Sequence, residues 1–247
     1  MADYDYKAGK KRIKDILNNK LEVIEQGSVP ADKDFTFNNG YYSWVTGIFV
    51  DIRDSSELFS NGDKEQVSKI IRSFTSEIIE ILRKDDDLRE IGIRGDCVYG
   101  VYTTPYKINI YEKADKTFWI NTYFKMLNKL LSEKKYPNIK AGIGMSTAQE
   151  LVVKAGRKDT GINNKVWIGE AVAKAANLSS LANKNGVSPI AFSKLSYSNF
   201  IDELVNKSGE KAKGWFNYRH DDRIGYYYDV NLIKNDFYSW INNGMID

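Results

Sequence analysis

The chain has 247 residues, of which 42% are hydrophobic and 28% charged, as is typical of a folded globular protein. Its 36 Lys and Arg residues exceed its 33 Asp and Glu residues by three, too small a charge to indicate nucleic-acid binding. A single cysteine excludes an internal disulfide, and a single histidine excludes a metal site of several histidines. Charges interrupt the first 30 residues and no apolar run reaches about 18 residues, so we expect a cytoplasmic protein without a membrane segment.

Hydrophobic periodicity predicts the elements in chain order. Helical spacing predicts an amphipathic helix over residues 8–26, which packs on its own domain or contacts a second subunit of a dimer. A short apolar run then predicts a buried strand over 44–52. The following predicted elements are a helix over 63–84, two strands joined by a turn at 94–96, a helix over 115–134, strands in NIKAGIGMS and ELVVKAG, an Ala-rich helix after VWIG, a strand in SPIAFS, a helix in KLSYSNFIDELVNK and a strand in RIGYYYDVNLI.

The order of strand, long helix, hairpin, long helix and strand is βαββαβ. This order predicts an α+β fold with an antiparallel-rich sheet and helices on one face. We expect an N-terminal helix and linker over residues 1–43, one main domain over 44–235 and a C-terminal tail over 236–247.

Two aspartates occupy positions that hydrophobic burial does not explain. Asp51 ends the predicted strand over 44–52, and Asp96 lies in the turn of the next hairpin. A βαββ arrangement places that strand beside the hairpin, so both carboxylates are expected at one edge of the sheet. Paired hard oxygen ligands suit Mg²⁺ or Mn²⁺, with the backbone carbonyl of Ile52 as a further ligand. Two capping aspartates without a metal are the alternative.

A second set of polar residues follows the first aspartate. Ser55 and Ser56 lie at a predicted helix start, where free backbone N–H groups and the helix dipole favour a phosphate. These positions are candidates for substrate binding.

Five sequence blocks resemble motifs of the class III nucleotidyl cyclases. GIFVDIRDSSELF resembles the first metal motif of that family, and GIRGDCVYGVY resembles the second, with matching spacing between the aspartates. IKAGIGMS, VWIGEAVAKAANLSSLAN and KAKGWFNYRHDDRIGYYYDV resemble later blocks, in family order, so that the resemblance covers roughly residues 44–230. It implies a ferredoxin-like cyclase domain that works as a homodimer, with two active sites across the interface.

The resemblance also implies a reaction and its metal ligands. Asp51 and Asp96 would hold two divalent ions, Mn²⁺ or Mg²⁺, which activate the ribose 3′-hydroxyl for attack on the α-phosphate. The products would be pyrophosphate and a 3′,5′-cyclic nucleotide.

The chain departs from the family pattern at the residues that read a purine. The purine-selecting Lys or Glu falls on Gly92, and the adenine-binding Asp falls on Val166. The transition-state Asn and Arg fall on Ala173 and Asn177. This pattern is most similar to the pyrimidine cyclases of bacterial anti-phage defence (Pycsar). It implies conversion of UTP to cyclic UMP, a second messenger read by a separate effector protein.

Three alternatives stay open at this point. A cytidylate cyclase would convert CTP to cyclic CMP, because the two bases differ only around C4. Adenylate cyclase activity would require the missing Lys and Asp. A catalytically silent module that binds nucleotides and dimerises would explain why the family's transition-state Asn and Arg are replaced at Ala173 and Asn177, but retention of Asp51 and Asp96 argues against it.

Four further residues are candidates for substrate binding. Phe49 shares a strand face with Asp51 because side chains alternate, so it is either the floor of a single-ring base pocket or an ordinary core aromatic. Arg94 is either the missing cation or a surface hairpin residue. Lys211 and Lys213 match the family's phosphate-binding lysine region, with a solvated loop as the alternative.

Overall fold

The computed structural model describes residues 3–158 and 160–246, apart from the side chain of Asn61. The strands are β1 Glu22–Glu25, β2 Asn39–Ile52, β3 Leu88–Arg94, β4 Cys97–Thr103, β5 Ala141–Gly156, β6 Asn163–Ile168, β7 Ile190–Ser193, β8 Asn217–Asp221 and β9 Gly225–Val230. The helices are α1 Tyr6–Asn18, α2 Ser55–Asn61, α3 Lys64–Arg83, α4 Lys107–Glu133, α5 Ala171–Leu181, α6 Lys194–Ser208 and α7 Asn235–Asn242, with short 3₁₀ turns η1 Asp32–Asp34 and η2 Glu210–Trp215.

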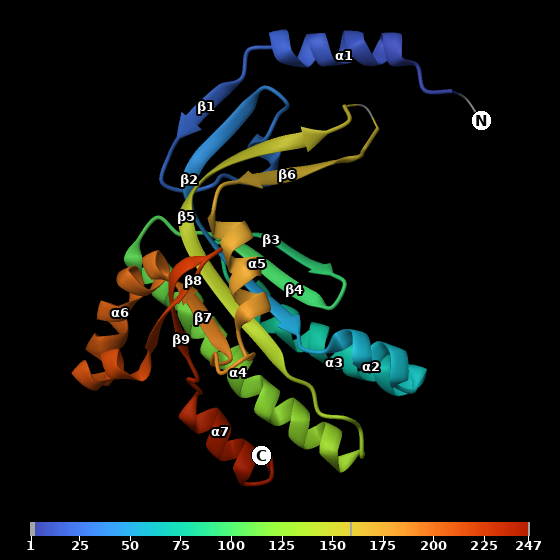
Figure 1. Ribbon diagram of the computed structural model, residues 1–247. Coiled ribbons are helices and arrows are strands. Elements are labelled where there is room, and N and C mark those ends of the chain that lie inside the picture. Colours follow the sequence, from blue (N-terminus) through green and yellow to red (C-terminus); the bar gives the residue numbers. More distant parts are fainter. Residues whose placement is uncertain (1–2, 159, 247) are drawn as a thin grey trace.

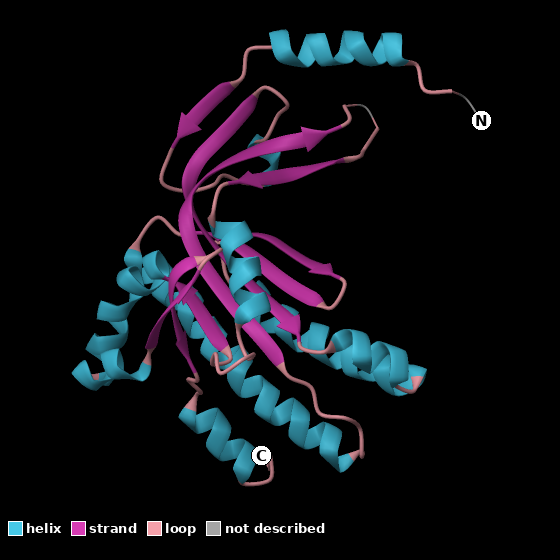
Figure 2. Cartoon of the chain, viewed as in Figure 1, coloured by secondary structure: helices cyan, strands magenta, loops and turns pink. Residues whose placement is uncertain are grey.

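The strands form a single twisted sheet flanked by helices (Figure 1, Figure 2). Their order is β3-β4-β2-β5-β7-β9-β8, and two further strands lie off this path, where β1 pairs with β2 and β6 pairs with β5. The succession β2, α3, β3, β4, α4, β5 is the predicted βαββαβ order, and the pairs within β3-β4-β2-β5 are antiparallel. The predicted α+β fold is therefore confirmed.

Alternation along β2 gives the sheet two different faces. Ile48, Val50 and Ile52 are at most 3% exposed and pack in the main core with apolar residues of α3 and α4. Gly47 points the other way, since a Cβ added there would lie 3.4 Å from the Cβ of Ala175 on α5. Helix α5 therefore covers the face opposite to α3 and α4, whereas the sequence analysis expected helices on one face only.

The N-terminal helix is shorter than predicted. Helix α1 ends at Asn18, and the chain turns extended at Asn19 before it enters β1, which pairs with β2 in parallel. Ile16 and Leu17 are 71% and 77% exposed, so the helix does not pack on its own domain as one interpretation expected. Figure 1 shows α1 projecting from the end of the sheet.

Two regions of the second half differ from the prediction for local reasons. NIKAGIGMS and ELVVKAG belong to one long strand, because the polar residues between them bond across the ladder; the hydroxyls of Thr46 and Thr147 are 2.8 Å apart. The predicted C-terminal tail forms α7, whose Phe237 ring lies 5.9 Å from the Trp119 ring of α4. Within the described part of the chain, no helix combines the length and apolar character needed to cross a bilayer.

Glycines in β5 allow α5 to lie directly on the sheet. A Cβ at Gly144 would be 2.1 Å from the carbonyl oxygen of Ala175 and 2.2 Å from the amide nitrogen of Ser179. We expect Gly144→Ala to lower the free energy of unfolding by about 1–3 kcal/mol, because helix and strand backbones must separate. Urea denaturation measures this change. Gly214→Ala is the control, since no heavy atom lies within 4 Å of its added Cβ, and equal stability of the two variants would contradict the packing argument.

Candidate active site

The pairing of β2 with β4 brings the two predicted carboxylates to one end of the sheet. Asp51 is the register partner of Cys97, which directly follows Asp96. The backbone amide of Ile52 donates to the carbonyl oxygen of Asp96 over 3.4 Å. Gly95 makes the tight turn possible with a φ of +62°, a conformation that other residues rarely adopt. The expected meeting of Asp51 and Asp96 is thus observed.

An arginine that the sequence analysis did not single out occupies the same end of the sheet. Arg53 Nη2 donates to Asp51 Oδ2 over 2.6 Å and to the carbonyl oxygen of Ser179 over 2.8 Å. Its Nη1 donates to the carbonyl oxygen of Ser180 over 2.8 Å. Because the arginine side chain is only 9% exposed, it joins the Asp51 carboxylate firmly to the end of α5.

The electrostatics of the pair favour a bound cation. Burial raises the pKa of Asp51, and the nearby charge of Asp96 raises it further, whereas Arg53 and Lys184 lower it without cancelling the increase. Arg53 Nε is buried and has no hydrogen-bond partner among the described residues. Two close carboxylates whose charge is incompletely balanced are the ligand type that Mg²⁺ and Mn²⁺ prefer, so the residues present fit a divalent ion.

The remaining ligands of such an ion cannot come from a larger acidic cluster. No group of three or more His, Cys, Asp and Glu side chains capable of holding a metal is found in the described ranges. Backbone and substrate oxygens would therefore complete the coordination, as is usual for Mg²⁺ that arrives with nucleotide phosphates.

An aromatic pair lies on the same sheet face as Asp51. Phe49 and Tyr99 are register partners on β2 and β4, and their rings stack with centroids 5.0 Å apart and planes 10° apart. Strand alternation in the sequence points to Phe49 as a base-pocket residue, but only the cross-strand register reveals Tyr99 beside it.

The other residues predicted near the carboxylates lie close to them in the fold. Ser55 and Ser56 open α2, a helix of seven residues, directly after Asp54. A cavity of about 450 Å³ adjoins this turn and is lined by Arg53, among others. Arg94 ends β3 as the register partner of Cys97, and its side chain is exposed.

The two predicted lysines lie elsewhere in the subunit. Lys211 and Lys213 belong to η2, which follows α6, and strands β5, β7 and β9 separate β2 from the far edge of the sheet. Lys213 Nζ is 2.8 Å from Glu210 Oε2. The subunit therefore does not bring these lysines to its own carboxylate pair. On α5, Ala173 and Asn177 both face solvent, one helical turn apart.

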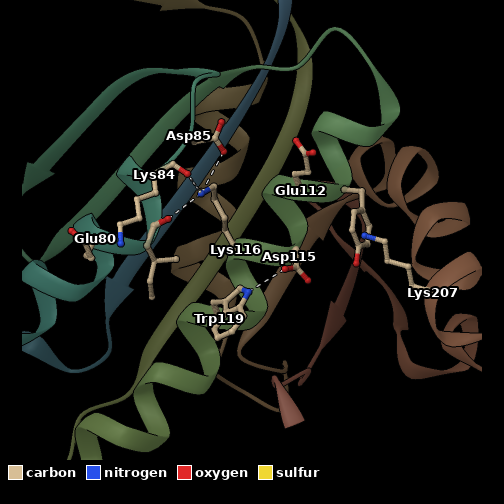
Figure 3. A pocket seen from close by; sticks show the side chains of 10 residues that line it. Glu80, Lys84, Asp85, Glu112, Asp115, Lys116, Trp119 and Lys207 are labelled. Carbon is tan, nitrogen blue, oxygen red and sulfur yellow. Dashed lines mark hydrogen bonds and ion pairs between the residues drawn. The ribbon is translucent and has the colours of Figure 1, made fainter. Parts of the chain in front are cut away.

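A larger cavity of about 750 Å³ lies among the helices that cover the other face of the sheet (Figure 3). Polar side chains that line it already have hydrogen-bond partners: Trp119 Nε1 donates to Asp115 Oδ2 over 3.1 Å, and Lys116 Nζ donates to the backbone carbonyl oxygen of Ile81 over 3.0 Å. None of the predicted site residues lines this cavity.

Comparisons with known proteins agree with this geometry. The chain is 57% identical to a protein named uridylate cyclase from Treponema porcinum, over 99% of this chain and 83% of the relative. It is 31% identical to a uridylate cyclase of Gulbenkiania mobilis, over 83% of this chain and 82% of that relative. No protein-family model matches the chain.

A solved structure shows the same fold at low sequence identity. The adenylyl cyclase CyaB from P. aeruginosa is 19% identical and superposes with a TM-score of 0.62, covering 80% of this chain and 98% of its own. The relatives show the family and the solved structure shows the fold: the chain belongs to the uridylate cyclases and has the fold of an adenylyl cyclase.

Proposed function

We propose that this protein converts UTP to 3′,5′-cyclic UMP and pyrophosphate. The observation that carries the proposal is the meeting of Asp51 and Asp96 at one end of the sheet. It occurs in a chain that is 57% identical to a protein named uridylate cyclase. The absence of the family's purine-reading side chains at Gly92 and Val166 supports a pyrimidine base.

The proposed reaction is an in-line phosphoryl transfer. The ribose 3′-oxygen forms a bond to the α-phosphorus, the bond from that phosphorus to the bridging oxygen breaks, and pyrophosphate leaves while the hydroxyl proton passes to solvent. Asp51, Asp96 and the carbonyl of Ile52 would hold Mn²⁺ or Mg²⁺, two ions in each site, which supply charge neutralisation and a lowered hydroxyl pKa. Phe49 forms the floor of a base pocket sized for a single ring.

The phosphate contacts in this proposal come from two subunits. Ser55 and Ser56 contact the phosphates from the turn after β2, and Arg94 supplies a cation from the neighbouring hairpin. Because η2 lies across the sheet from Asp51, Lys211 and Lys213 reach the phosphates from the second subunit of a homodimer. The exposed face of α5 would lie at the same interface.

We place the product in anti-phage defence, as a cytoplasmic second messenger read by a separate effector protein. The sequence pattern shared with the Pycsar cyclases supports this role.

A catalytically silent, nucleotide-binding dimerisation module is the second candidate. The short ion pair between Arg53 and Asp51 favours it, because the arginine engages one of the two carboxylates that the metal needs. Cytidylate cyclase activity, with CTP as the substrate, is the alternative within the enzyme class.

Incubation of the purified protein with ATP, GTP, CTP and UTP separately, each with Mn²⁺, tests the proposed activity. We expect mass spectrometry to identify cyclic UMP as the main product. Asp51→Ala and Asp96→Ala should each reduce its formation by roughly a hundredfold or more, because several kcal/mol of charge stabilisation are lost. Asp222→Ala, whose side chain is fully exposed, is the control. Turnover that survives the double replacement of Asp51 and Asp96 would contradict the metal assignment.

Metal binding has a readout that does not depend on turnover. We expect Mn²⁺ to raise the Tm of the wild-type protein, because a ligand that binds only the folded state stabilises it. Differential scanning calorimetry should show no such rise for the Asp51→Ala, Asp96→Ala double variant, whereas Asp222→Ala should respond like the wild type. An equal rise in the double variant would place the ion elsewhere.

Truncation of the stacking aromatic tests the base pocket. We expect Phe49→Ala to relax base choice towards purines, by about tenfold in the ratio of kcat/KM values, because the pocket gains volume. Product analysis with all four nucleotides measures the ratio. Unchanged selectivity would remove Phe49 from the pocket.

A further inference from the structure

The position that carries a purine-selecting side chain in the class III pattern is covered here by a tyrosine. Gly92 and Tyr99 are register partners on β3 and β4. A Cβ added at Gly92 would lie 2.7 Å from both Cζ and Oη of Tyr99. The tyrosine ring therefore rests on the bare glycine backbone and takes the space that a longer side chain at position 92 would need.

Three side chains from three other strands fix the position of this ring. The Tyr99 hydroxyl donates to Glu90 Oε1 over 2.8 Å, and the second oxygen of that carboxylate accepts from Trp167 Nε1 over 2.7 Å. The Phe49 ring stacks on the Tyr99 ring itself, with the two centroids 5.0 Å apart. Burial and the Glu90 carboxylate raise the pKa of Tyr99 to about 12, so the hydroxyl keeps its proton and the hydrogen bond persists at neutral pH.

The fixed Tyr99 ring lies beside the place where the nucleobase is expected to bind. Tyr99 lies on the sheet face of Asp51, two residues along β4 from the register partner of that carboxylate. Trp167 directly follows Val166, the position that matches the family's adenine-binding aspartate. Tyr99 thus covers Gly92, the first position associated with purine reading, and Trp167 is adjacent in sequence to Val166, the second.

We propose that Tyr99, held by Glu90 and Trp167, limits the base pocket to a single ring. Its phenol fills the volume that the second ring of a purine requires. This inference rests on the proposed cyclase function, and it adds a steric cause for pyrimidine selection that acts together with Phe49.

Two substitutions at the same position separate volume from hydrogen bonding. Tyr99→Ala removes the ring, and we expect the kcat/KM ratio of ATP or GTP to UTP to rise about tenfold or more. Tyr99→Phe keeps the ring and loses only the hydroxyl, so its ratio should stay close to that of the wild type. Tyr226→Ala is the matched control, because Tyr226 stacks on Tyr218 at 5.2 Å and 8° on strands at the far edge of the sheet.

The outcomes decide the proposal even if a variant is inactive. A purine-to-pyrimidine ratio in Tyr99→Ala equal to that of the wild type would overturn it. If circular dichroism shows that Tyr99→Ala is folded but the variant makes no product, competition binding of ATP against UTP replaces the turnover assay. An unchanged affinity for ATP relative to UTP would then also overturn the proposal. A wild-type protein that makes no cyclic pyrimidine would refute the proposed function instead, and the same binding ratio would still test the role of Tyr99.

Discussion

The antiparallel register between β2 and β4 is the constraint on which the site depends. It sets Asp51 opposite Cys97, so that the turn before Cys97 delivers Asp96 to the same end of the sheet. A slip of one residue would turn Asp51 into the core and expose the alternate residues. The core resists such a slip, because Val50 and Ile52 on either side of Asp51 are at most 3% exposed. Packing on one face thereby specifies chemistry on the other.

The sheet face that carries Asp51 holds charged groups that do not stabilise the fold by themselves. The Asp51 pKa is raised by burial and by Asp96, so the metal-free fold keeps a charge repulsion that a bound cation relieves. Arg53 offsets part of it by bridging the carboxylate to the last turn of α5. Gly142 lies directly beneath this bridge, because a Cβ added there would be 2.1 Å from the carbonyl oxygen of Ser179 and 3.0 Å from Arg53 Nη2. Helix packing, arginine and carboxylate thus form one connected unit.

The sequence predicted the features that depend on local periodicity and on motif spacing. Helix α3 and the hairpin of β3 and β4 follow from apolar patterns within single elements. The meeting of Asp51 with Asp96 follows from the βαββ order, which places β2 beside the hairpin. Features created by contacts between distant residues were not predicted. Glu90 and Trp167 are 77 residues apart in the chain, and no local pattern indicates that the Glu90 carboxylate accepts hydrogen bonds from both Trp167 and Tyr99. Helix α7 escaped for the same reason, since its apolar residues pack on α4 rather than on a neighbouring segment.

Anomalous diffraction from crystals grown with Mn²⁺ and a non-hydrolysable UTP analogue would locate the metal directly. We expect a manganese peak about 2 Å from carboxylate oxygens of both Asp51 and Asp96, with a nucleotide phosphate oxygen completing the coordination. A manganese ion bound by other residues, or by the nucleotide alone with Arg53 still paired to Asp51, would contradict this expectation.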